Sequence, residues 1–274
     1  MARGVGMVEA DRRDPIRLER RGAVAALLID RASRRNALNL AMWETVPAVV
    51  TAAEADPAVR VIILRSAVPG IFSAGADIEE LAGAASDPYW RRRNQAAIRA
   101  AQHALARADK PVIALIEGDC VGGGCGLAIA CDLRVAAPGA RLGITPARLG
   151  LVYSLDDTKL LVDLVGPSQA KRILFTGELL GAAEAQRIGL VDLVADDAAG
   201  VAGALAESIA AASPHSVRHA KRIVRRILDG QSADDADTLA LFADAFDGAD
   251  HREGVAAFLA KRRPCFGSSR SGDE

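Results

Sequence analysis

Short apolar runs alternate with longer amphipathic segments over the first two thirds of the chain. The runs are bounded by glycine, proline or charged residues, which is typical of strands buried in a sheet. The longer segments carry apolar residues three and four positions apart, as helices do. Strands are therefore expected at residues 24–29, 59–65, 112–116 and 133–136, and helices at residues 38–55 (interrupted early by Pro47), 89–108 and 125–131.

The pattern becomes helical in the last third of the chain. Alternating strands and helices predict an α/β fold with right-handed crossovers. From about Ser168 onward the spacing of apolar residues is helical, and Pro214 stands where a helix start tolerates proline. Helices are expected at residues 168–175, 182–188, 200–212, 215–228, 233–246 and 251–261.

The chain of 274 residues suits one large domain with a helical appendage. The first residues are charged and lack an apolar core, and the last ones are rich in serine and glycine. Four parts are expected: a flexible tail at residues 1–14, an α/β core at 15–199, a C-terminal helical region at 200–266 and a disordered tail at 267–274.

Composition narrows the range of partners. Half of the residues are hydrophobic, a quarter are charged, and the formal net charge is −1. Such a balance gives no electrostatic reason to expect nucleic acid or an anionic membrane as the main partner. No apolar run reaches the ~18 residues that a membrane span needs. With no secretory signal in residues 1–13, the cytoplasm is the expected compartment.

The cysteines and histidines do not predict a metal site. Four cysteines lack any C-x-x-C spacing, so neither a disulfide framework nor a thiolate metal site is expected. His215 and His219 are four residues apart and could share one helical face, but no acidic third ligand accompanies them. We expect both histidines to be surface residues, and no Ser-His-Asp set is evident.

Two glycine-containing segments, residues 72–78 and 121–127, each follow a predicted strand. Glycine lets a backbone approach a ligand closely, and free N–H groups at a helix start attract negative charge. Two such N–H groups that converge on one oxygen would form an oxyanion hole. The alternative is that these turns only pack strand against helix. A dinucleotide loop is not favoured, because Leu127 stands where G-x-G-x-x-G needs glycine, and the G-K-S/T of a Walker loop is absent.

Five motifs occur in a fixed order from about residue 15 to 266. They are RNALN at 35–39, FSAGADI at 72–78, KPVIALIEG at 110–118 followed by GGGC at 122–125, CDL at 131–133, and AAFLAKRRPCF at 256–266. In this order and spacing the chain resembles the crotonase superfamily, the enoyl-CoA hydratase/isomerase family. The resemblance implies a spiral of repeated ββα units with a C-terminal helical region that builds homotrimers, often paired into hexamers. It also implies an acyl-CoA thioester as substrate and no separate cofactor, because coenzyme A enters as part of the substrate.

The resemblance assigns roles to individual positions. The backbone N–H groups of Ala76 and Gly123 match the two donors that hold the thioester oxygen as it becomes negative. Arg34 and Lys261 are cations that could meet the coenzyme's phosphates, although a solvated surface face is the alternative for each. Residues that match the family's coenzyme A contacts are Asn36, Ala37, Leu38, Ala74, Asp77, Ile78, Phe258 and Lys261.

The sequence departs from the pattern of the family's hydratases, which use two glutamates to activate water and move a proton. The first of these positions falls on Gly126 and the second on Pro146, with Ala147 beside it. None of these side chains can transfer a proton. Ordinary hydration through that pair is therefore not expected.

Two features near residue 155 offer other chemistry. The segment TPARLGLVYSL at 145–155 is similar to the methylmalonyl-CoA decarboxylase branch, in which the residue matching Tyr153 contacts the substrate's carboxylate region, although that branch has histidine at Ala76. Loss of CO₂ creates an enolate without any base.

Asp156 and Asp157 lie close to the aspartate of family isomerases, and an apolar pocket would raise the pKa of such a carboxyl.

At most one aspartate of that pair can face a site, because neighbouring side chains point in different directions. The alternative is that both charge the N-terminus of a helix running from Thr158. The favoured hypothesis is an acyl-CoA enzyme that stabilises a thioester enolate, with Tyr153 and one aspartate as its reactive side chains. The alternatives are a decarboxylase and a non-catalytic acyl-CoA-binding oligomer.

Overall fold

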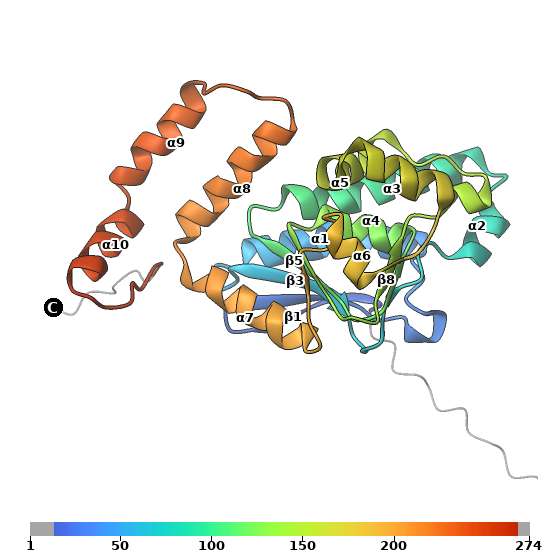
Figure 1. Cartoon of the computed structure of the whole chain (residues 1–274), viewed down its shortest axis with the longest axis horizontal. Helices are drawn as coiled ribbons and strands as arrows, with labels where there is room; N and C mark the ends of the chain where they lie inside the picture. Colours follow the sequence, from blue (N-terminus) through green and yellow to red (C-terminus); the bar gives the residue numbers. More distant parts are fainter. Residues whose placement is uncertain (1–13, 268–274) are drawn as a thin grey trace, which may run out of the picture.

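The computed structural model describes residues 14–267, so most of the two expected tails lies outside the described residues. Figure 1 shows two sheets covered by helices, and a group of C-terminal helices that projects away from them. The first sheet has the order β1-β2-β3-β5-β7-β10, and the second has the order β4-β6-β8-β9. The strands of the first sheet are β1 (Ile16–Arg21), β2 (Val24–Ile29), β3 (Val61–Ser66), β5 (Val112–Ile116), β7 (Leu133–Ala136) and β10 (Leu193–Val194).

The two sheets are built from consecutive pairs of strands. The second sheet contains β4 (Ile71–Ser73), β6 (Asp119–Val121), β8 (Arg141–Gly143) and β9 (Leu180–Gly181). β3, β5 and β7 lie parallel in the first sheet, and β4, β6 and β8, which directly follow them, lie parallel in the second. Each pair is followed by a helix. This repetition is the ββα spiral expected from the resemblance, and it confirms the expected fold class.

The helices largely match the apolar periodicity. They are α1 (Leu40–Ala55), α2 (Ile78–Ala84), α3 (Pro88–Arg107), α4 (Gly123–Ala130), α5 (Leu155–Thr176), α6 (Ala182–Arg187), α7 (Ala198–Ala211), α8 (Pro214–Leu228), α9 (Ala236–Phe246) and α10 (Ala249–Leu259). The sequence did not predict β1 or the short strands of the second sheet. β1 (IRLERR) is charged and its second half is exposed, and a strand of two or three residues is too short to show a period.

Two helices differ from expectation at a proline. Pro47 was expected to interrupt its helix, but α1 continues through it because Val46 before the proline and Val50 after it are both buried. Burial of such side chains offsets the ~3 kcal/mol that an internal proline costs. Gly166 before Pro167 is non-helical within α5 (φ +74°), so only the second half of this helix, expected at 168–175, had been identified.

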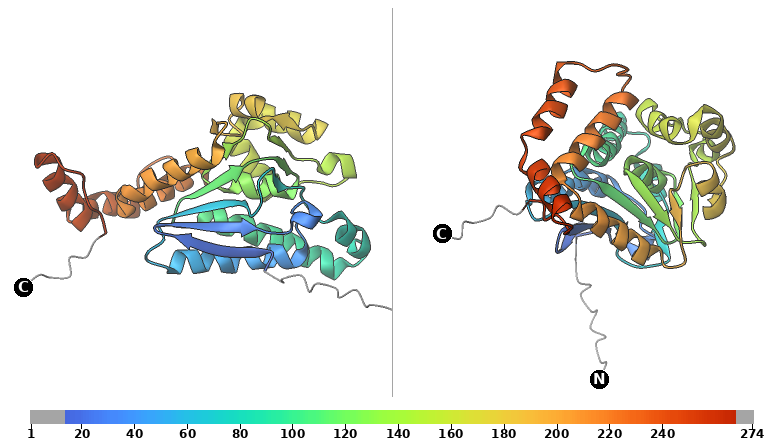
Figure 2. Two further views of the ribbon diagram at one scale, coloured as in Figure 1. Left: turned by 90° about the horizontal axis from the view of Figure 1, so that it is seen from below. Right: turned by 60° about the vertical axis from the view of Figure 1, so that its left-hand side comes forward.

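The hydrophobic core lies on both faces of the first sheet. Ile62 and Leu64 of β3 face the larger core, between the two sheets and α1, whereas Val61 and Ile63 face a smaller one. Alanines of α7 cover that smaller core. The expected boundary at residue 200 therefore falls inside α7, and the projecting part begins with α8 (Figure 2).

α4 lies so close to the end of β4 that only glycine fits between them. A Cβ on Gly124 would lie 2.6 Å from Ser73 Cβ and 3.0 Å from Ser73 O. Gly83, also inside a helix, has nothing within 4 Å of its Cβ position. The contact between α4 and β4 therefore depends on the missing side chain of residue 124.

We expect Gly124→Ala to destabilise the protein by about 1–3 kcal/mol, because neither neighbouring atom belongs to a flexible side-chain end. Gly83→Ala is the matched control and should stabilise by about 0.5–1 kcal/mol through helix propensity. Urea unfolding of both variants measures the difference. Equal stability of the two variants would contradict the close approach.

Candidate active site

The two glycine-containing segments meet at one edge of the second sheet. β4 and β6 are parallel neighbours, so the segments that follow them leave from the same edge. A Cβ on Gly75 would lie 2.7 Å from Val121 O and 3.4 Å from Gly123 N. Gly75 also has φ +97°, a conformation that favours glycine. The backbone on one segment is therefore in direct contact with the start of α4.

Two backbone N–H groups are left without partners at this contact. Leu38 N donates to Gly75 O (2.7 Å) and Asp77 N donates to Leu38 O (2.9 Å), and Ala76 N lies between these bonds. Gly123 is the first residue of α4, so its N–H has no intrahelical acceptor. Within residues 14–267 neither group donates to another backbone or side-chain atom, and both residues are partly exposed. Such a pair can stabilise a developing negative charge on one oxygen.

The position of the first expected glutamate, Gly126, is enclosed by other side chains. A Cβ on Gly126 would lie 2.5 Å from Gln102 Nε2 and 3.1 Å from Tyr153 Oη. Gln102 comes from α3 and is 3% exposed. Gln102 was not among the residues expected at the site. The available signal was a polar residue beside the buried positions of α3, next to Ala101 and three residues before Leu105.

Asp157 and Asp156 have different environments, as expected for neighbouring side chains. Asp157 is 6% exposed, and its Oδ2 accepts from Ser154 Oγ (2.6 Å), whereas Asp156 is exposed. Burial raises the pKa of Asp157, opposed by hydrogen bonding from Ser154 and Gln102. The helix begins at Leu155 with Ser154 as its N-cap, three residues before the expected start at Thr158. Both aspartates lie in its first turn, so the alternative that they charge a helix N-terminus is confirmed.

Tyr153 completes a buried polar cluster with Gln102 and Asp157. Burial, together with the nearby Asp157, raises the pKa of Tyr153 well above its usual range, so the phenol is neutral. Gln102 Oε1, Tyr153 Oη and Asp157 Oδ1 are buried without a hydrogen-bond partner among the described residues. Unpartnered buried polar atoms are costly, and they are often found where a protein performs chemistry.

The loop expected to line coenzyme A is held by Asn36. This side chain is fully buried, donates to Ser66 Oγ (2.8 Å) and Phe72 O (3.0 Å), and accepts from Arg31 N (2.9 Å). Its polar atoms are therefore already engaged within the chain. Leu38 is also buried, which leaves Ala37 as the partly exposed member of this expected group.

The second group of expected coenzyme A contacts lies at the start of α2. Asp77 caps this helix by accepting from Glu79 N and Glu80 N, and its ion pair with Arg31 (2.6 Å) lowers its pKa. Ala74 is partly exposed, and Ile78 is half exposed. Arg34 pairs with Glu79 (2.7 Å) on the surface, in line with the alternative of a solvated face.

A single chain does not bring the C-terminal contacts to the site. Phe258 is 82% exposed on α10, and Lys261 follows that helix on the surface. Figures 1 and 2 show α10 at the opposite end of the molecule from α2. Any contact of these residues with the site therefore requires another copy of the chain.

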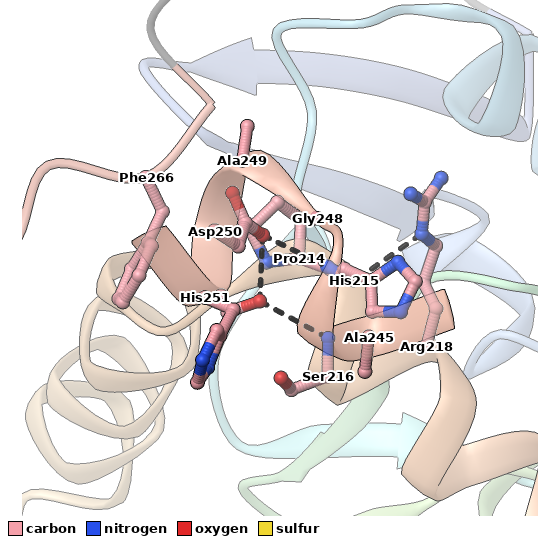
Figure 3. A pocket seen from close by; sticks show the side chains of 11 residues that line it. Pro214, His215, Ser216, Arg218, Ala245, Gly248, Ala249, Asp250, His251 and Phe266 are labelled. Atoms are coloured by element: carbon pink, nitrogen blue, oxygen red, sulfur yellow. Dashed lines mark hydrogen bonds between the residues drawn. The ribbon is translucent and has the colours of Figure 1, made fainter. Parts of the chain in front are cut away.

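His215 lines a cavity of about 400 Å³ between the start of α8 and the start of α10, whereas His219 is not among its lining residues (Figure 3). Asp250 Oδ2 accepts from Ser213 Oγ (2.6 Å) and from His215 N (3.4 Å), so α10 caps the start of α8. The rings of His215 and His219 meet edge to face, with centroids 4.2 Å apart. Residues 14–267 contain no group of three or more His, Cys, Asp or Glu side chains arranged to hold a metal.

In the part of the chain that the structure describes, no helix is both long enough and apolar enough to cross a membrane.

The class of enzyme suggested by the motifs agrees with the fold, with the unpaired amides of Ala76 and Gly123, and with the buried acid. A family model for enoyl-CoA hydratase/isomerase matches residues 19–269. The chain belongs to this family and is an acyl-CoA enzyme of the lyase or isomerase type.

Individual relatives agree over nearly the whole chain. A crystal structure of an enoyl-CoA hydratase/isomerase family protein from Hyphomonas neptunium is 41% identical, with a TM-score of 0.89, covering 92% of this chain and 97% of that chain. The mitochondrial methylglutaconyl-CoA hydratase of Homo sapiens is 35% identical over 259 residues, 90% of this chain and 74% of that protein. The short-chain-enoyl-CoA hydratase of Clostridium acetobutylicum is 32% identical over 262 residues, 90% of this chain and 95% of that protein. None of these three is named a decarboxylase, so they give no support to the local similarity at residues 145–155.

The buried carboxyl predicts a pH-dependent change in stability. The folded-state pKa of Asp157 is raised, so its protonated form favours folding, and stability is lost as pH rises through that pKa. We expect Asp157→Asn, which stays neutral, to raise Tm at neutral pH and to lose this advantage below about pH 4, the unfolded-state value. Asp156→Asn is the exposed control. Thermal unfolding across pH checks this, and parallel curves for both variants would contradict it.

Proposed function

We propose that this protein holds the thioester oxygen of an acyl-CoA between the N–H groups of Ala76 and Gly123 and uses Asp157 to move a proton. The proximity of two unpaired amides, where the segments after β4 and β6 meet, is the observation that carries this proposal; a Cβ on Gly123 would lie 3.8 Å from Ala76 N. Removal of a proton next to the thioester carbonyl places negative charge on that oxygen, where the two donors stabilise it. One such donor typically contributes about 2.7–4 kcal/mol to transition-state stabilisation.

The favoured reaction is a shift of the double bond in an enoyl-CoA. Gly126 and Pro146, which match the family's two glutamates by resemblance, cannot exchange a proton. Isomerisation needs one group that takes a proton from one carbon and returns it to another, so atoms balance without added water. A buried carboxyl with a raised pKa suits both steps. Asp157 is preferred to Asp156 because only Asp157 is buried.

The test is mass-spectrometric turnover of crotonyl-CoA, a 3-enoyl-CoA and methylmalonyl-CoA, each with a no-enzyme control. Migration of the double bond in the 3-enoyl-CoA supports the proposal. Rapid hydration of crotonyl-CoA would mean that the residues at 126 and 146 do not limit hydration. Release of CO₂ would favour a decarboxylase in which Tyr153 contacts the substrate, and binding without turnover would favour a non-catalytic oligomer.

Replacement of the proposed acid–base group should separate it from its neighbour. We expect Asp157→Asn to lower kcat by roughly 10²–10⁴-fold, the usual contribution of a general acid–base group. Asp156→Asn changes the adjacent exposed carboxyl and should stay close to the wild-type rate. Steady-state kinetics on the substrate that turns over measures both variants. A larger loss for Asp156→Asn would exclude Asp157 as the proton carrier.

We also propose that the projecting helices bind further copies of this chain. They expose a group of large apolar side chains, a feature typical of an interface. Contact with a second copy would also allow Phe258 and Lys261 to reach coenzyme A in a neighbouring site. The choice between homotrimer and hexamer stays a prediction. The exposed apolar residues on α8, α9 and α10 are Ile223, Val224, Ile227, Leu239, Phe242, Phe246, Val255, Phe258 and Leu259.

Charge at this surface should dissociate the oligomer. We expect the double variant Phe242→Asp/Phe246→Asp to sediment as a smaller species than the wild type, because burial of a carboxylate in an apolar interface is unfavourable. Phe175→Asp, at an exposed phenylalanine of α5, is the control and should leave the assembly intact. Sedimentation velocity compares the three proteins. A monomeric wild type would refute the proposed interface.

A further inference from the structure

We propose that Ser73 is the positioning residue of the oxyanion hole. Its hydroxyl fixes the turn that presents the Ala76 N–H, and its side chain packs against the start of α4, which presents the Gly123 N–H. The catalytic consequence rests on the proposed function, in which these two amides hold the thioester oxygen. Ser73 ends β4 and is 0% exposed, so it does not touch the substrate itself.

One side-chain hydrogen bond helps to hold the four backbone amides of residues 74–77. The first and the last of these amides donate to backbone carbonyls in residues 35–38, at 2.9 Å each. The second, Gly75 N, donates to Ser73 Oγ (3.2 Å), whereas the third, Ala76 N, makes no hydrogen bond among the described residues. Gly75 N is therefore the amide of this segment that a side chain holds and that a substitution can release.

The Ala76 N–H takes its direction from the carbonyl of Gly75. A trans peptide unit is planar, and its C=O and N–H point in opposite directions. Gly75 O accepts from Leu38 N (2.7 Å), so the Ala76 N–H in the same plane points away from Leu38. The direction of this donor is therefore only as well defined as the conformation of the Gly75 turn.

The Ser73 hydroxyl joins this turn to the loop beside it. Its Oγ donates to Asn36 O (2.7 Å) and accepts from Gly75 N (3.2 Å), and both partner residues are buried. Without the hydroxyl, a buried N–H and a buried C=O would both lose this partner, which is costly. The Gly75 amide could then find another partner only by rotation of the turn, and that rotation would change the direction of the next amide.

The same side chain lies against the element that carries the second donor. A Cβ on Gly124 would lie 2.6 Å from Ser73 Cβ and 2.8 Å from Ser73 Oγ, so α4 packs directly against Ser73. Gly123, whose N–H is the second donor, immediately precedes Gly124. One buried side chain therefore contacts the supports of both amides, and a change in it should disturb the geometry that the pair presents to one oxygen.

The alternative is that Ser73 only stabilises the fold, as a hydrogen-bonded buried serine can do elsewhere. Ser66, the last residue of β3, provides the matched control. It is 2% exposed, and its Oγ accepts from Asn36 Nδ2 (2.8 Å) and from Val68 N (3.1 Å). Within the described residues this hydroxyl makes no hydrogen bond to the Gly75 turn. Ser66→Ala therefore removes a buried hydroxyl from another side of Asn36 and should lower Tm without disturbing the two donors.

The first experiment observes the oxyanion hole without any turnover. The probe is butyryl-CoA with an isotope label at the thioester carbonyl carbon, a saturated acyl-CoA that has no double bond to move. Hydrogen bonds to a carbonyl oxygen weaken the C=O bond and lower its stretching frequency, which isotope-difference infrared spectroscopy measures on the bound probe. We expect wild type and Ser66→Ala to lower this frequency equally, relative to the probe in water, and Ser73→Ala to lower it less.

Two results would overturn the role of Ser73. Equal frequencies in wild type and Ser73→Ala would show that the two amides keep their geometry without the hydroxyl. A shift in Ser66→Ala as large as that in Ser73→Ala would show that loss of any buried hydroxyl in this region has the same effect.

Ser73→Cys keeps the proposal testable if Ser73→Ala does not fold. A thiol replaces the hydroxyl on the same Cβ but is only a weak hydrogen-bond donor and acceptor. We expect the frequency of the bound probe to lie between the values in wild type and in water. A wild-type frequency in Ser73→Cys would show that hydrogen bonds of this side chain do not orient the amides, against the proposal.

Kinetics then separate positioning from substrate binding. With the substrate that turns over, Ser73→Ala should lower kcat by roughly 10–100-fold, because misplaced donors stabilise the developing charge less well. KM should stay within about twofold of the wild-type value, since the contacts with the rest of the acyl-CoA are kept. Ser66→Ala should keep both constants. A raised KM with an unchanged kcat would assign Ser73 to substrate binding, against the positioning role.

The infrared and kinetic results together distinguish this inference from the proposed function. A lowered frequency in wild type with no turnover of any substrate would overturn the proposed reaction but not the role of Ser73. Turnover with equal frequencies in wild type and Ser73→Ala would overturn only the role of Ser73. An unchanged frequency in wild type would overturn the oxyanion hole itself, and the role of Ser73 with it.

Discussion

The contact between two backbone segments at the ends of β4 and β6 is the constraint on which the site depends. Parallel pairing brings the Gly75 turn to within van der Waals distance of the start of α4. A side chain at Gly75 would force the segments apart, and a side chain at Gly123 would collide with Trp43. The strands fix the segment that contains Gly75, and the start of α4 fixes the other segment. The N–H groups of Ala76 and Gly123 therefore remain unpaired in a place otherwise enclosed by core residues. Oxyanion stabilisation of this kind needs donors that are already oriented before charge develops.

Behind this contact, the protein keeps polar atoms where a well-packed core would have none. Gln102, Tyr153 and Asp157 are buried together, and an atom of each lacks a partner within the described residues. Burial of an acid without an ion pair costs stability at neutral pH, and it also gives the acid a pKa suited to proton exchange. The same desolvation therefore weakens the fold and provides the chemistry. A glycine at residue 126 allows the cluster to form.

The C-terminal helices differ from one another in how far they bury their apolar side chains. α7 covers one face of the first sheet with alanines, whereas α8, α9 and α10 leave large apolar side chains exposed. Asp250 links α10 to the start of α8, so these helices keep a defined arrangement within one chain. Exposed apolar groups of this kind are typical of interaction surfaces, in line with the proposed contact with further copies of the chain. A complete site would then combine elements from more than one copy.

The sequence by itself determined the α/β alternation, the three strands β2, β5 and β7 at their bounds and most helices, because burial imposes a periodicity that can be recognised locally. The spiral of ββα units followed only from the resemblance of the motifs to a known family. It also indicated that at most one aspartate of residues 156–157 would face a site. The tertiary structure alone decided that this residue is Asp157, that Asn36 is engaged within the chain, that α1 continues through Pro47, and that Gln102 lies beside Gly126. These outcomes depend on contacts between residues far apart in sequence. Local spacing carries no information about such contacts, since elements that are distant along the chain form them.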